Sequence, residues 1–570
     1  MARLLLIPAA MLVLLIGALV WSGGGTQSRA DLTFINRGEI GTLDPNRMAW
    51  MQDIRVGYCI FEGLYTLDPA TLNAVPGASE PAEISADKTV YTFRIRPNAR
   101  WSNGDPVTTA DFVFAWKRML QEPGDYTSLL YYIKGAREYM KAFAEWGKAR
   151  SEATAKADPS AAIPAEPGFA GVGIEPLDSR TLRVTLNHPV GFFLDIIAFP
   201  CCFPLHEKSM QPFIDKDVRK ATGKIVYDKR FTLPPNLLTN GAYELTSWDF
   251  KRRIRLTASQ YWWNKDAVKT KSIDVVSADD YLWALTIYDT GGVDWLTDMS
   301  GELAADLLKK GRKDVHVYPG FGTYFYTFNC KEKLADGRKN PFADVRVRQA
   351  FSMAVNKQVI VDNVTRLGEP ITTQYIPPYA FEKYPSPKGL GYNVERAKQL
   401  MAEAGYPGGK GFPDITLLFN SEGQHGPIAQ IVRRQWQEAL GVDLRLESIE
   451  INTFRQRLHN KEYAVARASW YGDYNDPSTF TDKYKSESDN NDSAWINPEY
   501  DALCAKADRE RDDGERLKLF AQAEKLLLEE APILPMYHYM NVYLYRPEQV
   551  HGMMHHSRNH QVMWPIEVKR

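Results

Sequence analysis

Residues 465–480 read Val-Ala-Arg-Ala-Ser-Trp-Tyr-Gly-Asp-Tyr-Asn-Asp-Pro-Ser-Thr-Phe, an apolar start followed by aromatic rings and two acids. The first half suits a buried strand, and Gly472 with the later Asn-Asp-Pro run predicts that this strand ends in a loop. Loop side chains commonly meet ligands, so Asp473 is expected to face a cation, with Trp470 and Tyr474 as walls. The alternative is a strand end whose aromatic residues belong to the core and whose acid caps a turn.

The size and charge of the chain limit its architecture and its partners. A chain of 570 residues with 44% hydrophobic content can bury a large core and is too long for one ordinary domain, so two or three lobes are expected. Its 69 basic and 70 acidic residues are well mixed and give a formal net charge of -1. A nucleic-acid-binding surface needs a basic excess, so no nucleic acid is expected as a partner.

The first 30 residues have the order of an export signal: Met1-Ala2-Arg3, an apolar run from Leu4 to Trp21, and a Ser-Gly-Gly-Gly turn. The protein is therefore expected to be periplasmic or otherwise extracytoplasmic. The run is longer than the ~7 to 15 residues of a typical signal core, and residues 28–30 make a poor cleavage site. An uncleaved membrane anchor over residues 4–21 is the alternative.

Cysteine, histidine and methionine residues raise the question of disulfides or a metal. The five cysteines are an odd number without CxxC spacing: Cys59, Cys201, Cys202, Cys330 and Cys504. A cluster near the C-terminus contains His551, Met553, Met554, His555, His556 and His560. These side chains suit copper or nickel, but their spacing fits no defined site, so neither a metal nor another cofactor is predicted.

Signatures of catalysis are missing from the sequence. It contains no GxSxG elbow, HExxH motif, Walker loop or GxGxxG fingerprint, and His206-Glu207 lacks a second histidine. A binding protein is therefore favoured over an enzyme.

Strand and helix patterns alternate along the chain, which is typical of an α/β fold. Strands are predicted at 89–96 and 181–186, with a helix at 110–120 and a surface helix and flexible insertion over 140–167 between them. Further helices are predicted at 53–65, 345–365, 394–404, 426–439 and 515–529, and further strands at 415–420, 442–447 and 533–545.

Seven short motifs occur in the order found in one family: Leu43-Asp44-Pro45, Phe61-Glu62-Gly63-Leu64, Trp101-Ser102-Asn103-Gly104 with Val107-Thr108 and Asp111-Phe112, Thr239-Asn240-Gly241-Ala242-Tyr243, Tyr261-Trp262, Pro341-Phe342 with Asp344-Val345-Arg346-Val347-Arg348, and Ala402-Glu403-Ala404-Gly405-Tyr406. Through them the chain resembles the peptide-binding proteins of ABC importers, solute-binding protein family 5. The resemblance extends from about Leu32 to Ile566.

The resemblance implies an α/β, three-lobed periplasmic-binding-protein-like fold of the cluster C type, with two main lobes, a hinge and an inserted extra lobe. Lobe I would comprise residues 31–62, 196–318 and 536–570, lobe II residues 63–195, and lobe III residues 319–535. Members clamp a short extended peptide by its main chain between lobes I and III, and roomy pockets leave little sequence preference. They deliver it to an ABC permease with its ATPase subunits.

The resemblance also implies roles for individual residues. Asp473 falls on the acid that pairs with the α-ammonium group of the peptide, so a free amino terminus would be required. A desolvated ammonium needs such a partner because losing hydration alone costs several kcal/mol. Trp470 and Tyr126 fall on pocket walls of the family, and Arg467 and His425 on its two carboxylate-facing positions. Ala49 and Met51 fall where lobe I contacts the ligand. An internal salt bridge is the alternative for Arg467, and a solvated loop position for His425.

Several positions depart from the family pattern. Ile451 stands where the family has a pocket tryptophan, and Leu458 where it has a cation. Thr365 replaces a lysine of the family, and Gly320 a cleft tyrosine. The arginines that could restore the missing positive charge at the far end of the peptide are Arg457, Arg455 and Arg366. Gly322 and Tyr471 replace the two cysteines of a disulfide found in the family. Proteins of the same architecture also bind nickel chelates, haem and oligosaccharides, which remain alternatives for the ligand. A peptide-processing enzyme and a chaperone-like role remain alternatives for the function of the whole protein.

Overall fold

The computed structural model describes residues 28–155, 165–222, 224–488 and 490–570. The signal or anchor predicted over residues 4–21 lies outside these ranges. Within them, no helix combines the length and the apolar character needed to cross a membrane.

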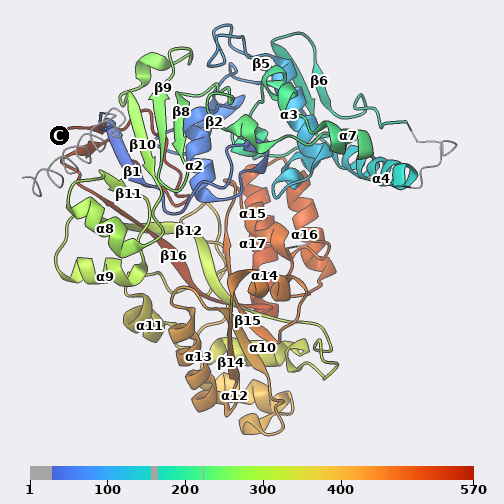
Figure 1. The fold of residues 1–570 in the computed structure, drawn as a ribbon. Coiled ribbons are helices and arrows are strands. Elements are labelled where there is room, and N and C mark those ends of the chain that lie inside the picture. The colour runs from blue at the N-terminus through green and yellow to red at the C-terminus, as the bar shows by residue number, and fades with distance from the viewer. Residues whose placement is uncertain (1–27, 156–164, 223, 489) are drawn as a thin grey trace, which may run out of the picture.

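One ten-stranded sheet runs through the molecule (Figure 1). Its strands lie in the order β14 (Arg445–Ile449), β13 (Thr416–Asn420), β15 (Val465–Tyr471), β12 (Val315–Phe328), β16 (Ile533–Tyr545), β11 (Trp295–Leu296), β1 (Leu32–Ile35), β10 (Ser272–Val276), β9 (Arg253–Ala258) and β8 (Tyr243–Asp249). β12 and β16 are the longest strands and pair antiparallel. They connect an upper part, residues 28–314 and 546–570, to a lower part, residues 329–532.

Alternation along β12 explains how one strand serves two cores. Tyr324, Tyr326 and Phe328 pack into one buried cluster, whereas Phe325 packs into another, as expected for side chains that point to opposite faces. The pairing of β12 with β16 is irregular between Pro319 and Thr323, so the two strands are locally bent between the upper and lower parts.

The upper part contains a second sheet and most of the N-terminal helices. The sheet has the order β4 (Glu83–Ile84), β5 (Val90–Arg94), β7 (Thr181–Thr185) and β6 (Ile174–Pro176), and a hairpin pairs β2 (Tyr65–Leu67) with β3 (Ala74–Pro76). The helices are α2 (Met51–Ile60), α3 (Thr109–Gln121), α4 (Ala136–Ala155), α5 (Phe193–Ile197), α6 (Glu207–Met210), α7 (Lys216–Thr222), α8 (Tyr281–Asp289) and α9 (Gly301–Lys309). A Thr108–Asp111 capping box fixes the start of α3.

The lower part is built mainly from helices around β13, β14 and β15. They are α10 (Val345–Met353), α11 (Lys357–Ile360), α12 (Val394–Glu403), α13 (His425–Leu440), α14 (Ile451–His459), α15 (Ser478–Thr481), α16 (Pro498–Arg509) and α17 (Asp513–Glu530). Two short strands near the C-terminus, β17 (Val550–His551) and β18 (Glu567–Val568), pair in the upper part.

Two predicted helices differ from the observed ones. The helix predicted over 345–365 is divided into α10, α11 and a π-helical turn, because Asn356 caps a new helix start by accepting from the N–H of Gln358. The helix predicted over 53–65 begins at Met51 and ends at Ile60, where the chain becomes extended at Phe61. The strand predicted over 533–545 matches β16. The surface helix predicted after residue 140 is the later part of α4. Residues 156–164, part of the predicted flexible insertion, lie outside the described ranges.

The loop after β15, in the lower part, contacts α5 of the upper part, which is itself tied to the C-terminal segment. Asp195 forms an ion pair with Arg558, both Oδ atoms lying 3.1 Å from one guanidinium nitrogen, and accepts the N–H of Asn475 at 2.7 Å. Beside it, the ring of Tyr474 stacks on Phe192 with centroids 4.7 Å apart. The loop that follows β15 is therefore held against α5 and the C-terminal segment.

Candidate functional site

Asp473 lies just beyond the end of β15, as predicted. Its N–H donates to Thr479 Oγ1 at 2.8 Å, and the preceding N–H of Gly472 donates to the carbonyl oxygen of Phe321 at 2.9 Å. A Cβ atom at Gly472 would collide with the Phe321 ring, so glycine is required for this close approach of the loop to β12. The loop therefore holds the carboxylate in one place.

In the part of the chain that the structure describes, the Asp473 carboxylate has a polar neighbour but no cationic partner. The hydroxyl of Tyr126 donates to Oδ1 at 3.3 Å, from a point 347 residues away in the sequence. Within the described residues, no arginine or lysine forms an ion pair with this carboxylate. Burial raises the pKa of Asp473 to about 6, an increase that the Tyr126 hydrogen bond partly offsets.

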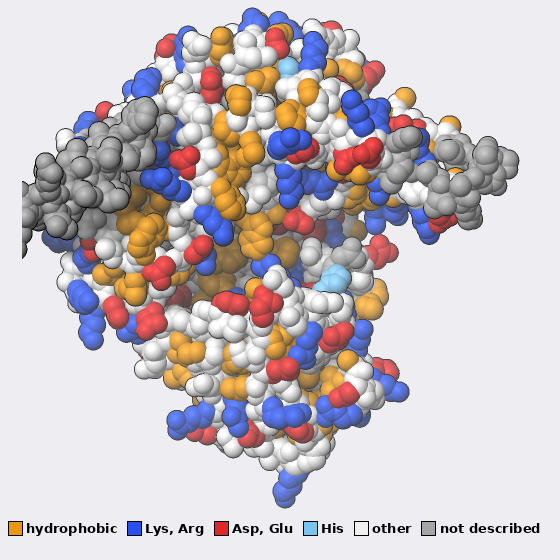
Figure 2. Space-filling view, in the orientation of Figure 1, with side chains coloured by type: hydrophobic (Ala, Val, Ile, Leu, Met, Phe, Trp, Pro, Cys, Tyr) orange, Lys and Arg blue, Asp and Glu red, His pale blue; other side chains and the backbone are white. Residues whose placement is uncertain are grey.

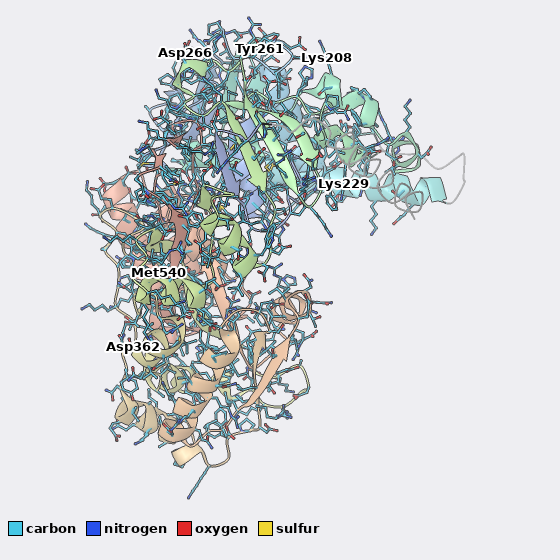
Figure 3. The ribbon with its side chains drawn as sticks, turned by 60° about the vertical axis from the view of Figure 1, so that its left-hand side comes forward. Lys208, Lys229, Tyr261, Asp266, Asp362 and Met540 are labelled. Carbon is cyan, nitrogen blue, oxygen red and sulfur yellow. The ribbon has the colours of Figure 1, made fainter. Side chains whose placement is uncertain are left out.

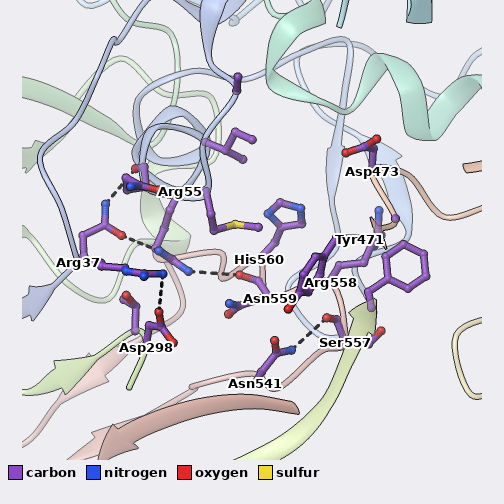
Figure 4. Close-up of a pocket in the computed structure, with 18 of the residues that line it drawn as sticks. Arg37, Arg55, Asp298, Tyr471, Asp473, Asn541, Ser557, Arg558, Asn559 and His560 are labelled. Atoms are coloured by element: carbon purple, nitrogen blue, oxygen red, sulfur yellow. Dashed lines mark hydrogen bonds and ion pairs between the residues drawn. The ribbon is translucent and has the colours of Figure 1, made fainter. Parts of the chain in front are cut away.

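A cavity of about 400 Å³ adjoins Asp473 between the upper and lower parts (Figure 4). Figure 2 shows the surface hollowed between these parts, and in Figure 3 Met540, which lines the cavity, lies between Tyr261 above and Asp362 below. The lining comes from segments distributed along the chain: Asn36, Arg37, Ala49, Met51, Gln52, Ile54, Arg55, Tyr126, Phe199, Thr297, Asp298, Phe321, Tyr471, Gly472, Asp473, Met540, Asn541, Val542, Ser557, Arg558, Asn559 and His560.

Four of the predicted site residues therefore share one cavity. Asp473 and Tyr126 lie at one end of its lining, and Ala49 and Met51 enter from the start of α2. An edge-to-face contact between the rings of Tyr126 and Phe199, with centroids 4.8 Å apart, fixes the tyrosine beside the carboxylate.

Arg467 and His425 form a separate polar group along the same strand. Arg467 donates to the hydroxyl of Tyr539 at 3.0 Å and lies 5.2 Å from the ring of Tyr324, and His425 packs on that same ring. Burial and the charge of Arg467 lower the pKa of His425 to about 3, so this imidazole is neutral. Arg467 has no carboxylate partner among the described residues.

Period two along β15 places Arg467 and Tyr471 on one face. Tyr471 lines the cavity and stacks on Tyr539, which in turn binds Arg467. A continuous row of side chains thus leads from the Asp473 end of the cavity to Arg467, although neither Arg467 nor His425 lines the cavity itself.

Trp470 and Tyr474 do not line this cavity. Trp470 points to the other face of β15, where its Nε1–H donates to the carbonyl oxygen of Thr479 at 2.7 Å and its ring faces Lys483. Tyr474 is buried against Phe192. Both placements match the alternative in which the aromatic residues of this stretch belong to the core, and their role as ligand contacts stays a prediction.

The three arginines considered as replacements for missing family cations are engaged elsewhere. Arg457 pairs with Glu447 at 2.5 Å, Arg366 pairs with Asp306 at 3.0 Å, and Arg455 lies 4.9 Å over the ring of Trp50. None of them lines the cavity beside Asp473.

The cysteines and the histidine-methionine cluster form no compact ligand set in the described residues. All five cysteines are free, and the sulfur atoms of Cys201 and Cys202 lie 3.7 Å apart. His555 stacks on Tyr318 and shares a hydrogen bond with Tyr545, whereas His560 is buried in the cavity wall. No group of three histidine, cysteine or acidic side chains in the described ranges is placed to hold a metal ion.

Comparison with known proteins identifies the family. Residues 73–492 match the model for bacterial extracellular solute-binding proteins, family 5. The chain belongs to this family. The predicted family is thus confirmed, and so is the prediction that the chain is a binding protein and not an enzyme.

Relatives of this family 5 protein align over most of its length. It is 31% identical to the periplasmic oligopeptide-binding protein OppA of Salmonella typhimurium over 518 residues, covering 90% of this chain and 88% of the relative. It is 32% identical to the dipeptide-binding protein DppE of Bacillus subtilis, covering 84% and 81%.

Solved structures confirm the predicted α/β fold class of this family 5 protein. The murein tripeptide-binding protein MppA of Escherichia coli superimposes with a TM-score of 0.75 at 27% identity, covering 95% of this chain and 99% of that one. The OppA protein of Haemophilus influenzae in complex with RPPGFSPFR superimposes with a TM-score of 0.73 at 26% identity, covering 95% and 100%.

Sequence reasoning missed several residues of the cavity. Arg55, Asp298, Asn541 and Asn559 come from distant segments that carry no common motif. Of the cavity residues that were missed, His560 had been noted in the sequence, as part of a histidine and methionine cluster considered for metal binding.

Proposed function

We propose that this protein captures short peptides with a free amino terminus between its lobes and delivers them to the permease and ATPase subunits of an ABC importer. One observation carries the proposal: Asp473 presents a carboxylate without a cationic partner, among the described residues, to a cavity large enough for part of a peptide. An α-ammonium group would supply the missing charge.

Arg467 and His425 are proposed to receive the far end of longer peptides. Asp473 lies six positions after Arg467, which is at most roughly 20 Å at about 3.3 Å per residue. A peptide of about five residues spans up to ~17 Å, and the two side chains make up the remainder. The free guanidinium N–H groups of Arg467 and a neutral His425 suit a carboxylate.

The lobe assignment supports closure around such a ligand. We take lobe I as residues 31–62, 196–318 and 536–570, lobe II as 63–195 and lobe III as 319–535, with the irregularity of β12 at Pro319–Thr323 beside one boundary. A ligand that contacts both sides favours the closed state by its differential affinity. Export to the periplasm, with residues 1–30 as a signal or residues 4–21 as an anchor, completes the proposal.

The test compares free and N-acetylated forms of one pentapeptide by calorimetry at pH 7. Acetylation removes the ammonium charge, so the acetylated peptide is expected to bind at least ~30-fold more weakly, about 2 kcal/mol. A form of the same pentapeptide with a central lysine acetylated on its side chain, and with both termini free, controls for the loss of a positive charge in general. Equal affinity of the free and acetylated peptides would contradict the role of Asp473.

Peptide affinity is also expected to fall in acid. The pKa of Asp473 is about 6 without a ligand, and an ammonium partner lowers it, so below pH 6 the carboxyl must lose a proton before pairing. Affinity should drop about 10-fold between pH 7 and pH 5, while the peptide amine stays charged. His425, with a pKa of about 3, does not titrate in this window.

Calorimetry at several pH values measures this dependence, and two variants control it. Asp473→Asn should bind weakly with little change over the same range. Tyr126→Phe removes the hydrogen bond that lowers the pKa of Asp473, so the decline should begin at higher pH. A pH-independent affinity in the unsubstituted protein would refute the assignment.

A further inference from the structure

Not every charged side chain around the cavity has an ion-pair partner among the described residues. Its charged lining residues are Arg37, Arg55, Asp298, Asp473 and Arg558. Arg37 pairs with Asp298 at 3.0 Å, and Arg558 pairs with Asp195 at 3.1 Å. Arg55 and Asp473 are left without an ion pair among the described residues. The cavity therefore holds one uncompensated charge of each sign.

Arg55 is a buried guanidinium that binds only neutral acceptors. Its side chain belongs to α2, and the residue is 3% exposed. Nη1 donates to Asn36 Oδ1 at 2.6 Å and Nη2 to the carbonyl oxygen of Asn559 at 3.4 Å (Figure 4). Nε donates to Gln561 Oε1 at 3.0 Å. A guanidinium has five N–H donors, so these bonds leave two available.

Asp298, the acid whose charge acts on Arg55, is occupied by other donors. Asp298 accepts from Arg37, from the hydroxyl of Tyr281 at 3.2 Å and from the N–H of Met299 at 2.9 Å. It acts on Arg55 through space without forming an ion pair. Burial lowers the pKa of Arg55 to about 10, which still leaves the side chain charged at neutral pH.

A second polar group in the cavity wall is also available. The ring of His560 lines the cavity and is buried, and its Nδ1 atom has no hydrogen-bond partner in the described residues. Burial and the charges of Arg558 and Arg55 lower its pKa well below the usual value, so the imidazole is neutral. A neutral imidazole can donate one N–H to an anionic oxygen without adding charge.

We propose that this protein selects peptides that bring a carboxylate to Arg55 while their amino terminus pairs with Asp473. The inference rests on the proposed function and adds a substrate class to it. The carboxylate has two possible sources: the C-terminus of a very short peptide, or an acidic side chain near the amino terminus of a longer one. Both would offset the buried charge of Arg55 and use its free N–H groups.

Two sets of peptides separate these sources by calorimetry. The first compares dialanine and trialanine with their C-terminal amides. The second compares C-terminally amidated pentaalanine carrying glutamate or glutamine at position 1, 2 or 3. Tighter binding of the short free acids than of their amides would identify the C-terminal carboxylate as the partner of Arg55. Tighter binding of glutamate than of glutamine at one position would identify an acidic side chain as that partner. We expect at least a 10-fold preference in one of the two sets.

Substitutions of Arg55 locate the preference. Arg55→Gln keeps hydrogen-bonding capacity but removes the charge, and should reduce the preference to less than 3-fold; Arg55→Lys keeps the charge and should retain part of it. Arg433→Gln removes an arginine that pairs with Asp443 at 2.6 Å outside the cavity and should leave the preference unchanged. Thermal unfolding verifies that each variant is folded.

The outcomes distinguish this inference from the proposed function. If peptides bind only with a free amino terminus but carboxylate and neutral forms bind equally, the role of Arg55 is refuted and the proposed function stands. A preference that persists in Arg55→Gln also refutes it. If Arg55→Gln does not fold, Arg55→Lys becomes the test. A carboxylate preference as strong in Arg55→Lys as in the unsubstituted protein would then show that the guanidinium N–H groups are not needed, and would refute their role. Absence of binding by any peptide overturns both proposals.

Discussion

Asp473→Ala is expected to abolish most peptide binding. The substitution removes the carboxylate that would neutralise a desolvated ammonium, and loss of one partner of a buried charge pair costs about 2–5 kcal/mol, or roughly 30- to 3,000-fold in affinity. Calorimetry with one pentapeptide measures the change. Because the ligand-free carboxylate is held without a cation, its removal should leave the thermal unfolding temperature unchanged or higher.

Asp266→Ala provides the matched control for this experiment. Asp266 is exposed in the upper part of the molecule and lies outside the cavity lining (Figure 3). Its substitution should leave affinity within experimental error. If Asp473→Ala bound the peptide as tightly as this control, the amino-terminal anchor would have to be sought elsewhere.

Arg558→Met is expected to cause the largest loss of stability. Arg558 and Asp195 have side chains that are 3% and 9% exposed, and removing the guanidinium leaves a buried carboxylate without its partner. Such losses cost about 3–5 kcal/mol in free energy of unfolding. Arg558 also donates to the carbonyl oxygen of Leu72, so the C-terminal segment loses a second attachment.

Chemical denaturation measures this effect, and a double variant separates charge from shape. Asp195→Asn combined with Arg558→Met removes both charges while an amide oxygen can still accept the N–H of Asn475. The double variant should recover more than half of the lost stability. An unfolding free energy for Arg558→Met equal to that of the unsubstituted protein would show that the ion pair contributes nothing.

The sequence was most informative where local pattern and long-range packing agree. β16 has the predicted limits because thirteen residues of apolar and aromatic character suit only a buried strand. The loop position of Asp473 followed from Gly472 and the turn residues after it. Tyr126 was placed through family resemblance, since no local rule relates residues 347 positions apart.

The cavity wall could not be predicted because charged residues on a helix usually indicate a solvated face. α2 buries both Asp53 and Arg55, so its periodicity does not separate inner from outer positions. The burial of Arg55 depends on Asn36 and Gln561, which come from opposite ends of the chain. Partners of this kind are fixed by the fold and leave no spacing in the sequence.

The sheet described above also determines when the protein can finish folding. β12 meets β16 across 215 residues at the Thr323–His538 contact, so β16 is synthesised long after β12. Contacts so distant in sequence form slowly. A nascent chain that has not yet added β16 leaves one long edge of β12 unpaired, so the central sheet closes only after β16 is synthesised.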